Sequence, residues 1–405
     1  MTEVAVPRRA GTVQGVVLLL PISMTVATLV LFTASVALMT EHFRGIAHAD
    51  YLVQLVITIP AIGILLFAPL AGWLTDAIGR RRILVGSMLA YAVFGCAPYV
   101  LDNIYAILLT RCALGLCVSA VVTASTTMIS DYFKGRARER WFAAQAAVSA
   151  ISAVVLIWVG GRLGAAFGWR GPFLAYAYSV VLAIAIWALT WEPSEESPDE
   201  LITNEAVSYT QFPLARMLGI CIVTLAASIT FYAVSTQNAN ALVSLGVHDP
   251  AEIGRLSAVA TFGTVLGTAA FGALGRLPTA GLLTLDFALL GIGFVLMAAS
   301  SSATVYTMSA VVQQFGCGLV LPTLLVWATR GLAFRIRGRA IGMWQAAFQV
   351  GQLLSGITIT FLAAHSAGLL HAFSVLGVAC LGAAVVSGFA AFTLLRRAGR
   401  ARAGA

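Results

Sequence analysis

The stretch G-W-L-T-D-A-I-G-R-R-R-I-L, residues Gly72 to Leu84, joins two long apolar segments through a turn with three consecutive arginines. Similar apolar segments recur along the whole 405-residue chain, which is 60% hydrophobic and only 10% charged. An ordinary soluble domain carries about 25% charged residues. Each apolar segment is close to the roughly 20 residues that cross a bilayer as a helix. The sequence therefore predicts an all-α integral membrane protein.

Hydropathy predicts twelve membrane-spanning helices, six on each side of one long polar stretch. This stretch, residues 192–213, is rich in acidic residues and is typical of a linker between two halves, residues 1–191 and 214–405. The expected spans are 14–39, 51–74, 83–101, 104–129, 141–166, 171–191, 214–236, 252–275, 279–300, 303–331, 339–363 and 369–395.

The net charge of +8 follows the predicted topology. Most of the 24 Lys and Arg residues fall on the side of the N-terminus, whereas the opposite side has Arg44, Arg162, Arg170 and Arg255, and one span contains Arg111. This asymmetry is the positive-inside rule, and it predicts that both termini are cytoplasmic. We therefore expect a multi-pass protein of a bacterial inner (plasma) membrane, surrounded by lipid and without a nucleic-acid partner.

The sequence contains no pattern typical of an ATP-binding loop or a catalytic nucleophile, and no metal-ligand spacing. The six cysteines all fall in apolar spans, where packing is their expected role. We expect a monomer that is not an enzyme and has neither a cofactor nor a metal site.

An internal repeat divides the chain into two related halves. The residues Lys134-Gly135-Arg136-Ala137, followed by Trp141, recur 203 positions later as Arg337-Gly338-Arg339-Ala340, followed by Trp344. The same offset aligns Gly115 with Gly318 and Arg111 with Gln314. Two homologous halves of this kind build transporters whose substrate site lies between the repeats.

The turn from Gly72 to Leu84 resembles the signature loop of the major facilitator superfamily, G-x-L-a-D-r-x-G-R-[RK]-[RK], and the resemblance extends over nearly the full length. Seven of its positions match, whereas Ala77 replaces the usual arginine; the matching residues are Gly72, Leu74, Asp76, Gly79, Arg80, Arg81 and Arg82. Arg111 and Gly115 resemble the family's R-x-x-x-G pattern in helix four. The resemblance implies a fold of two six-helix pseudo-repeats, alternating access, and a place near the bacterial drug and small-molecule efflux branch. The G-P-x-x-G-G pattern of proton-driven exporters is reduced to Gly160-Gly161.

The resemblance also implies a conformational latch at the cytoplasmic side. In the family the acidic residue and first arginine of the turn form a charge cluster with an acidic residue at the end of helix four, and the matching positions are Asp76, Arg80 and Asp131. Gly72 and Gly79 would allow close approach and a tight turn. The alternative is that the arginines only set the topology.

Arg111 lies well inside a predicted span, where a cation is costly and needs a reason. It could bind an anionic substrate or tune a proton site. The alternative is that its side chain extends to the outer interface or forms a structural ion pair with Glu41 or Asp102. Gln314, its counterpart in the repeat, is a second candidate for substrate or proton coupling.

The other candidates for substrate or proton coupling are polar side chains in apolar spans. Hydroxyl, amide and aromatic groups here suit a neutral or amphipathic organic molecule, although each could equally serve helix packing. These candidates are Tyr232, Gln345 and Gln349, with Asp286 as a possible proton carrier. The prediction is an exporter of small organic compounds by proton antiport. The alternatives are an importer of a small organic anion held by Arg111 and a sensor of the same fold that does not transport.

Overall fold

The computed structural model describes residues 10–133, 135–192, 212–274, 277–330 and 334–403. Within these ranges the side chains of two predicted gate residues, Gly72 and Asp76, lie outside the description, as does most of the predicted linker. The α-helices are α1 Thr12–Leu19, α2 Ile22–Val30, α3 Val36–His42, α4 Ala49–Thr58, α5 Pro60–Ile78, α6 Arg80–Cys96, α7 Ile104–Tyr132, α8 Gly135–Phe167, α9 Gly171–Leu174, α10 Tyr178–Leu189, α11 Leu214–Ser244, α12 Pro250–Leu274, α13 Thr279–Ala298, α14 Ala303–Thr329, α15 Phe334–Ala364 and α16 Leu369–Ala403.

Within the described part of the chain, ten helical segments are long and apolar enough to cross a membrane, or eleven if the bent pair α4 and α5 forms one span. One of the ten runs over 50 residues from Arg140 to Leu189 and reverses at Gly168, whose φ is +67°. Its first helix, α8, has 33 residues and extends about 50 Å at the α-helical rise per residue, which already exceeds the bilayer core. This segment therefore makes two crossings, which brings the number of spans to the predicted twelve.

Two spans that the sequence predicted as continuous are broken at prolines. Pro21 stands between α1 and α2, and the first span unwinds again into a short 3-10 turn at Thr33–Ser35. The second span bends by 40° where α4 ends and Pro60 begins α5. Proline has no N–H and clashes with the preceding turn, so a kink is the expected result.

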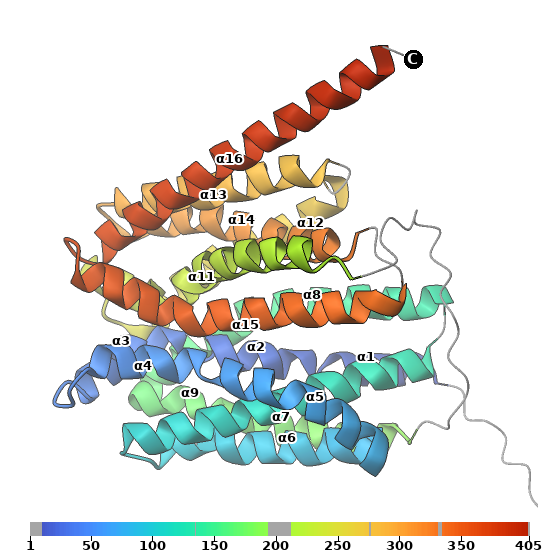
Figure 1. Ribbon diagram of the computed structural model, residues 1–405. Helices are drawn as coiled ribbons and strands as arrows, with labels where there is room; N and C mark the ends of the chain where they lie inside the picture. Colours follow the sequence, from blue (N-terminus) through green and yellow to red (C-terminus); the bar gives the residue numbers. More distant parts are fainter. Residues whose placement is uncertain (1–9, 134, 193–211, 275–276, 331–333, 404–405) are drawn as a thin grey trace, which may run out of the picture.

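The helices lie side by side with their axes in roughly one direction (Figure 1). Most of α1–α10 occupy the lower part of that view and α11–α16 the upper part. We call the right-hand end of the bundle, where α5 meets α6 at Gly79 and α7 ends at Tyr132, the basic end. The left-hand end, where α3 ends at His42, is the distal end.

The repeated glycines pack against equivalent helices. A Cβ atom on Gly115 of α7 would lie 2.1 Å from the carbonyl oxygen of Pro60 in α5, the second span. One on Gly318 of α14 would lie 2.3 Å from the carbonyl oxygen of Thr264 in α12, the eighth span. Only glycine fits such close backbone approaches. The fourth span thus packs on the second as the tenth packs on the eighth, which confirms two structurally related repeats.

Near the distal end, the first six spans touch the last six through close backbone contacts. Gly161 of α8 meets Gly254 of α12, and a Cβ on either residue would lie 2.7 Å from the Cα of the other. Gln54 of α4 lies against α15, where a Cβ on Gly356 would be 3.2 Å from the Gln54 Cβ. The two repeats are therefore tightly apposed at this end.

Candidate functional site

The basic turn consists of a single residue between two helices. Gly79 separates α5 from α6 with φ +106° and ψ 138°, a conformation that only glycine adopts without strain. The next residue, Arg80, forms an ion pair with Asp131 near the end of α7. Their side chains are 28% and 23% exposed, so the pair is partly protected from solvent. The structure therefore brings together Gly79, Arg80 and Asp131 of the predicted latch.

A second acidic group, Glu192, joins this cluster and was not predicted from the sequence. Its carboxylate accepts hydrogen bonds from the backbone N–H groups of Arg80 and Arg81, the latter at 3.2 and 3.3 Å. A carboxylate in this position caps the positive end of the α6 dipole. The only sequence signal for it was an acidic residue at the end of the sixth span, on the same side as the turn.

Aromatic side chains tie the turn to the sixth span. The Arg81 guanidinium lies 4.0 Å from the centre of the Trp187 ring and donates to the Trp187 carbonyl oxygen. The rings of Tyr132 and Trp191 stack at 4.9 Å, and the Tyr132 hydroxyl donates to the Trp191 carbonyl oxygen at 2.6 Å. The ends of α6, α7 and α10 thus form one connected unit at the basic end.

Arg111 lies in the core of the first six spans, with none of its side chain exposed. Its guanidinium donates to the carbonyl oxygens of Thr28 and, at 3.4 Å, Val56. Three rings surround it at 5.0 to 5.9 Å, those of Phe32, Phe173 and Tyr176. Carbonyl oxygens and ring faces both attract a cation, so they offset part of its desolvation.

The two carboxylates that the sequence offered as partners for Arg111 are engaged elsewhere. Glu41 pairs with Arg44, and Asp102 pairs with Arg170. The alternative of a structural ion pair with either carboxylate is therefore wrong, and backbone carbonyls take that place. One nitrogen of the guanidinium, Nη1, is buried and has no hydrogen-bond partner within the described ranges.

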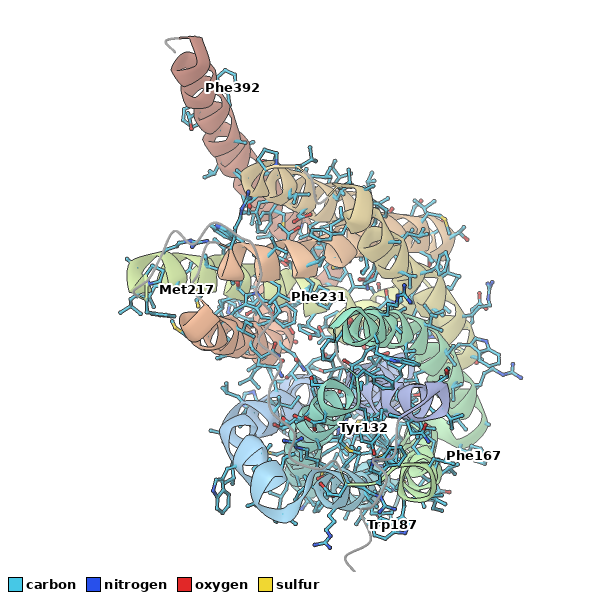
Figure 2. All side chains as sticks on the ribbon, turned by 90° about the vertical axis from the view of Figure 1, so that its right-hand side faces the viewer. Tyr132, Phe167, Trp187, Met217, Phe231 and Phe392 are labelled. Carbon is cyan, nitrogen blue, oxygen red and sulfur yellow. The ribbon has the colours of Figure 1, made fainter. Side chains whose placement is uncertain are left out.

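Aromatic residues of α11 and α15 form a wall in the middle of the molecule. The ring centres of Phe231, Tyr232 and Phe348 lie 4.9 to 5.6 Å from one another, and Trp344 stacks on Phe348 at 5.7 Å. Figure 2 views the bundle from the basic end. Phe231 lies near the middle of that view, above Tyr132 of α7. We call these four residues, with Gln349 on the same helix as Phe348, the aromatic–amide wall.

Several buried polar atoms near the wall have no partner among the described residues. The Trp344 Nε1, the Gln313 Oε1 and the Gln352 Nε2 are each buried without a hydrogen bond. Buried polar atoms are normally paired, because leaving one unpaired costs about 1–3 kcal/mol. Because the three atoms are buried, a molecule can pair with them only after the surrounding helices separate.

The remaining predicted amides have different surroundings. Gln349 is buried with 6% exposed, whereas Gln345, one turn earlier on α15, is exposed. The Gln314 side-chain oxygen accepts a hydrogen bond at 3.1 Å from Thr264 of α12. Gln314 therefore joins two helices of its own half. Helix packing also accounts for Ser228, whose hydroxyl donates at 2.6 Å to the Phe348 carbonyl oxygen.

Asp286 is completely buried in α13, which packs against α14 and α16. Neither carboxyl oxygen has a hydrogen-bond partner among the described residues. The hydroxyl of Thr323, beside it on α14, donates at 2.8 Å to the Leu319 carbonyl oxygen and so cannot also donate to the carboxyl. An unpaired charge in this position would be very costly.

Comparison with known proteins decides the family. The profile described as Major Facilitator Superfamily matches residues 16–236, more than half of the chain. The chain belongs to the Major Facilitator Superfamily. Members of this superfamily are transporters, so the protein is a secondary transporter of a small molecule and not an enzyme.

The names of the relatives within the Major Facilitator Superfamily refer to different substrates. The chain is 30% identical over 129 residues to the minor myo-inositol transporter IolF of Bacillus subtilis (strain 168), which is 32% of this chain and 29% of the relative. It is 26% identical over 194 residues to the multidrug resistance protein MdtG of Dickeya zeae (strain Ech586), or 46% and 47% of the two chains. The chain thus spans less than half the length of the curated relatives it matches.

Solved structures of transporters share the whole fold. A bacterial homologue of the human lysosomal transporter Spinster superposes with a TM-score of 0.77 at 16% identity, covering 96% of this chain and 98% of that one. The D-xylose-proton symporter superposes with a TM-score of 0.75 at 14% identity, covering 93% and 97%. These likenesses confirm the predicted fold of twelve helices in two pseudo-repeats.

Proposed function

We propose that this transporter exports small organic or amphipathic compounds by proton antiport through alternating access. The observation that carries the proposal is the aromatic–amide wall, because its five members are all uncharged and four of them are large aromatic side chains on one helix pair. Aromatic and apolar surface with a few polar groups is typical of sites for organic molecules. Of the relatives named above, the one matched over the longer stretch is a multidrug resistance protein.

The alternative, import of a small organic anion held by Arg111, is less well supported. The Arg111 guanidinium is fully buried among three rings and donates to two backbone carbonyls. An anion could reach it only if the first span moved away from α7. The unpartnered Nη1 is the observation that keeps this alternative testable.

Asp286 is the proposed proton carrier. A fully buried carboxyl without a donor is far more stable as the neutral acid, so we infer that it holds a proton in this conformation. A rearrangement of α13 against α14 that admits water would release the proton. Release of this proton would couple transport to the proton gradient.

The basic end is the proposed cytoplasmic side, and its charge cluster the proposed latch. Arg80, Asp131 and Glu192 hold the ends of α6, α7 and α10 together as one unit. Asp76 lies near the end of α5, one turn before Arg80 in sequence. It would complete the latch by accepting hydrogen bonds from a helix end of the other half. Gly72 would allow the close approach this needs. The membrane would be a bacterial inner membrane with both termini in the cytoplasm, and the working unit a monomer.

Flux measurements in membrane vesicles test direction and charge preference together. We expect inverted vesicles with an acidic interior to accumulate ethidium, an aromatic cation, and nigericin to abolish this by collapsing the pH gradient. Benzoate, an aromatic anion, should not accumulate under the same conditions. Accumulation of benzoate in right-side-out vesicles, with no flux of ethidium, would overturn the proposal in favour of anion import. Vesicles without the protein serve as the control.

A further inference from the structure

A cavity of about 260 Å³ opens at the distal end, between the first and the second six spans. Helices from both repeats line it. Asp50, Tyr51 and Gln54 come from α4, Gln237 and Asn240 from α11, and Thr360 from α15. We call this cavity the distal vestibule. Its volume lies just below the range of about 300–1,000 Å³ typical of small-molecule sites, so it fits a compact organic molecule.

The distal vestibule lies beyond the contact that closes the two halves. Gln54, which lines it, is also the residue that lies against Gly356 of α15. The α15 residues of the aromatic–amide wall, Trp344 to Gln349, lie two to three turns toward the basic end from Gly356. The vestibule and the wall are therefore separate places along the same interface.

On the α11 and α15 side of the distal vestibule, the polar side chains form hydrogen bonds with one another. The Asn240 amide donates to the Gln237 Oε1 at 2.9 Å, and the Gln237 amide donates to the Thr360 hydroxyl oxygen at 3.1 Å. This chain of three residues fixes the position of the α11 and α15 wall. Each of the two amides keeps its second N–H, so this side can still donate to a ligand.

The α4 side, by contrast, presents acceptors. Gln54 is 2% exposed, and its Oε1 is buried without a partner among the described residues. Asp50, one turn earlier on the same helix, is exposed and is the one charged residue among the described residues that line the cavity. A carboxylate and an amide oxygen at helical spacing can be satisfied only by hydrogen-bond donors. The negative charge of the Asp50 carboxylate also repels anions.

We propose that the distal vestibule is a second ligand site on the transport path, for neutral or cationic organic molecules that carry hydroxyl or ammonium donors. In the proposed topology it faces outside, so an exported molecule would occupy it last and an imported molecule first. The site depends on the protein being a transporter, which the superfamily shows, and not on the direction of export. It excludes small organic anions from that path.

Labelling with charged thiol reagents tests the sign of the electrostatic potential in the distal vestibule. Ala364 of α15 is exposed and lines the cavity, so Ala364→Cys places a thiol there without removing a polar group. In purified protein in nanodiscs, where both ends are accessible, we expect a cationic methanethiosulfonate to react about tenfold faster than an anionic one, relative to their rates with a free thiol. Asp50→Asn should remove this preference. Ser301→Cys, in the exposed loop between α13 and α14, is the control whose rates should not depend on Asp50.

Protection against labelling tests whether the distal vestibule binds a ligand. N-methylglucamine, sorbitol and gluconate share one six-carbon skeleton and differ in charge. We expect N-methylglucamine to slow labelling of Ala364→Cys most, sorbitol less, and gluconate not at all. A charge preference that persists in Asp50→Asn, equal protection by gluconate, or no protection by any of the three would overturn the proposal. Because no flux is measured, failure of the export proposal would not affect this result.

Discussion

Gly161 of α8 and Gly254 of α12 meet so closely that a Cβ atom on either one would lie 2.7 Å from the Cα of the other. A Cβ on Gly161 would also lie 2.6 Å from the Pro250 carbonyl oxygen. Backbone atoms cannot move aside as a flexible side chain can. Any residue larger than glycine here must therefore separate the two repeats at the distal end.

Gly254→Ala should lower the population of the conformation in which the distal end is closed. Overpacking of a tight contact costs about 1–3 kcal/mol, which is enough to change the population of two transport conformations substantially. The labelling rate of Ala364→Cys in nanodiscs should rise because the distal vestibule opens. Gly272→Ala in the same helix has open space around the added methyl group and should leave the rate unchanged. Equal rates in the two variants would contradict a gate at this contact.

The spans were predictable from the sequence because a bilayer demands long apolar helices. The repeat was predictable because the pattern from Lys134 to Trp141 recurs 203 positions later, and the same offset aligns Gly115 with Gly318. The breaks in the first span were harder to predict. Pro21 marks one of them, but the 3-10 turn at Thr33–Ser35 has no proline and depends on the helices packed around it. Local sequence does not contain that information.

The candidate site was predictable to a different degree at each residue. The pairing of Arg80 with Asp131 followed from the family resemblance, and the structure has it. Glu192 was missed because it lies 112 residues from Arg80 in sequence and meets it only through the folded bundle. The surroundings of Arg111 were missed because helical periodicity predicts which face of a helix is buried. It does not predict which neighbouring helix packs on that face.

The ion pair of Arg80 and Asp131 should couple the stabilities of their variants. Both side chains are about three-quarters buried, so we expect a coupling energy of about 1 kcal/mol, above the usual value for exposed pairs. A double-mutant cycle with Arg80→Gln and Asp131→Asn, measured by thermal unfolding in detergent, gives this energy. If the effects of the two substitutions simply add, the pair contributes nothing to holding α6 and α7 together.

Gly79→Ala should destabilise the turn between α5 and α6. The residue has φ +106°, where a side chain is strained by about 1–3 kcal/mol, and its Cβ would lie 3.1 Å from the Glu192 carboxylate that caps α6. We expect a lower unfolding temperature and slower flux. Gly86→Ala, in the middle of α6 with open space around it, should be neutral or slightly stabilising. A result in which both variants are equally stable would show that the turn tolerates another conformation.

Arg111→Gln should lower stability and the maximal rate of transport while leaving the KM for ethidium within about twofold, because the guanidinium contacts the protein's own carbonyls and rings rather than the aromatic–amide wall. Arg111→Lys should not restore full stability, since an ammonium cannot make both carbonyl contacts and also lie against three rings. Flux in proteoliposomes and thermal unfolding measure the two effects. A large rise in KM with unchanged stability would instead support a direct role in binding substrate.

Asp286→Asn should separate transport from the proton gradient. The amide is neutral and nearly the same shape as the protonated acid, so we expect the variant to fold with equal or greater stability despite the complete burial of this position. Accumulation of ethidium driven by a pH gradient should fall about tenfold or more, whereas exchange of ethidium at equal pH should continue at close to the normal rate. Asp249→Asn is the matched control, because Asp249 is an exposed residue whose side chain caps α12 and asparagine caps a helix equally well. If gradient-driven accumulation survives in Asp286→Asn, the proton is carried elsewhere and the buried carboxyl has a structural role alone.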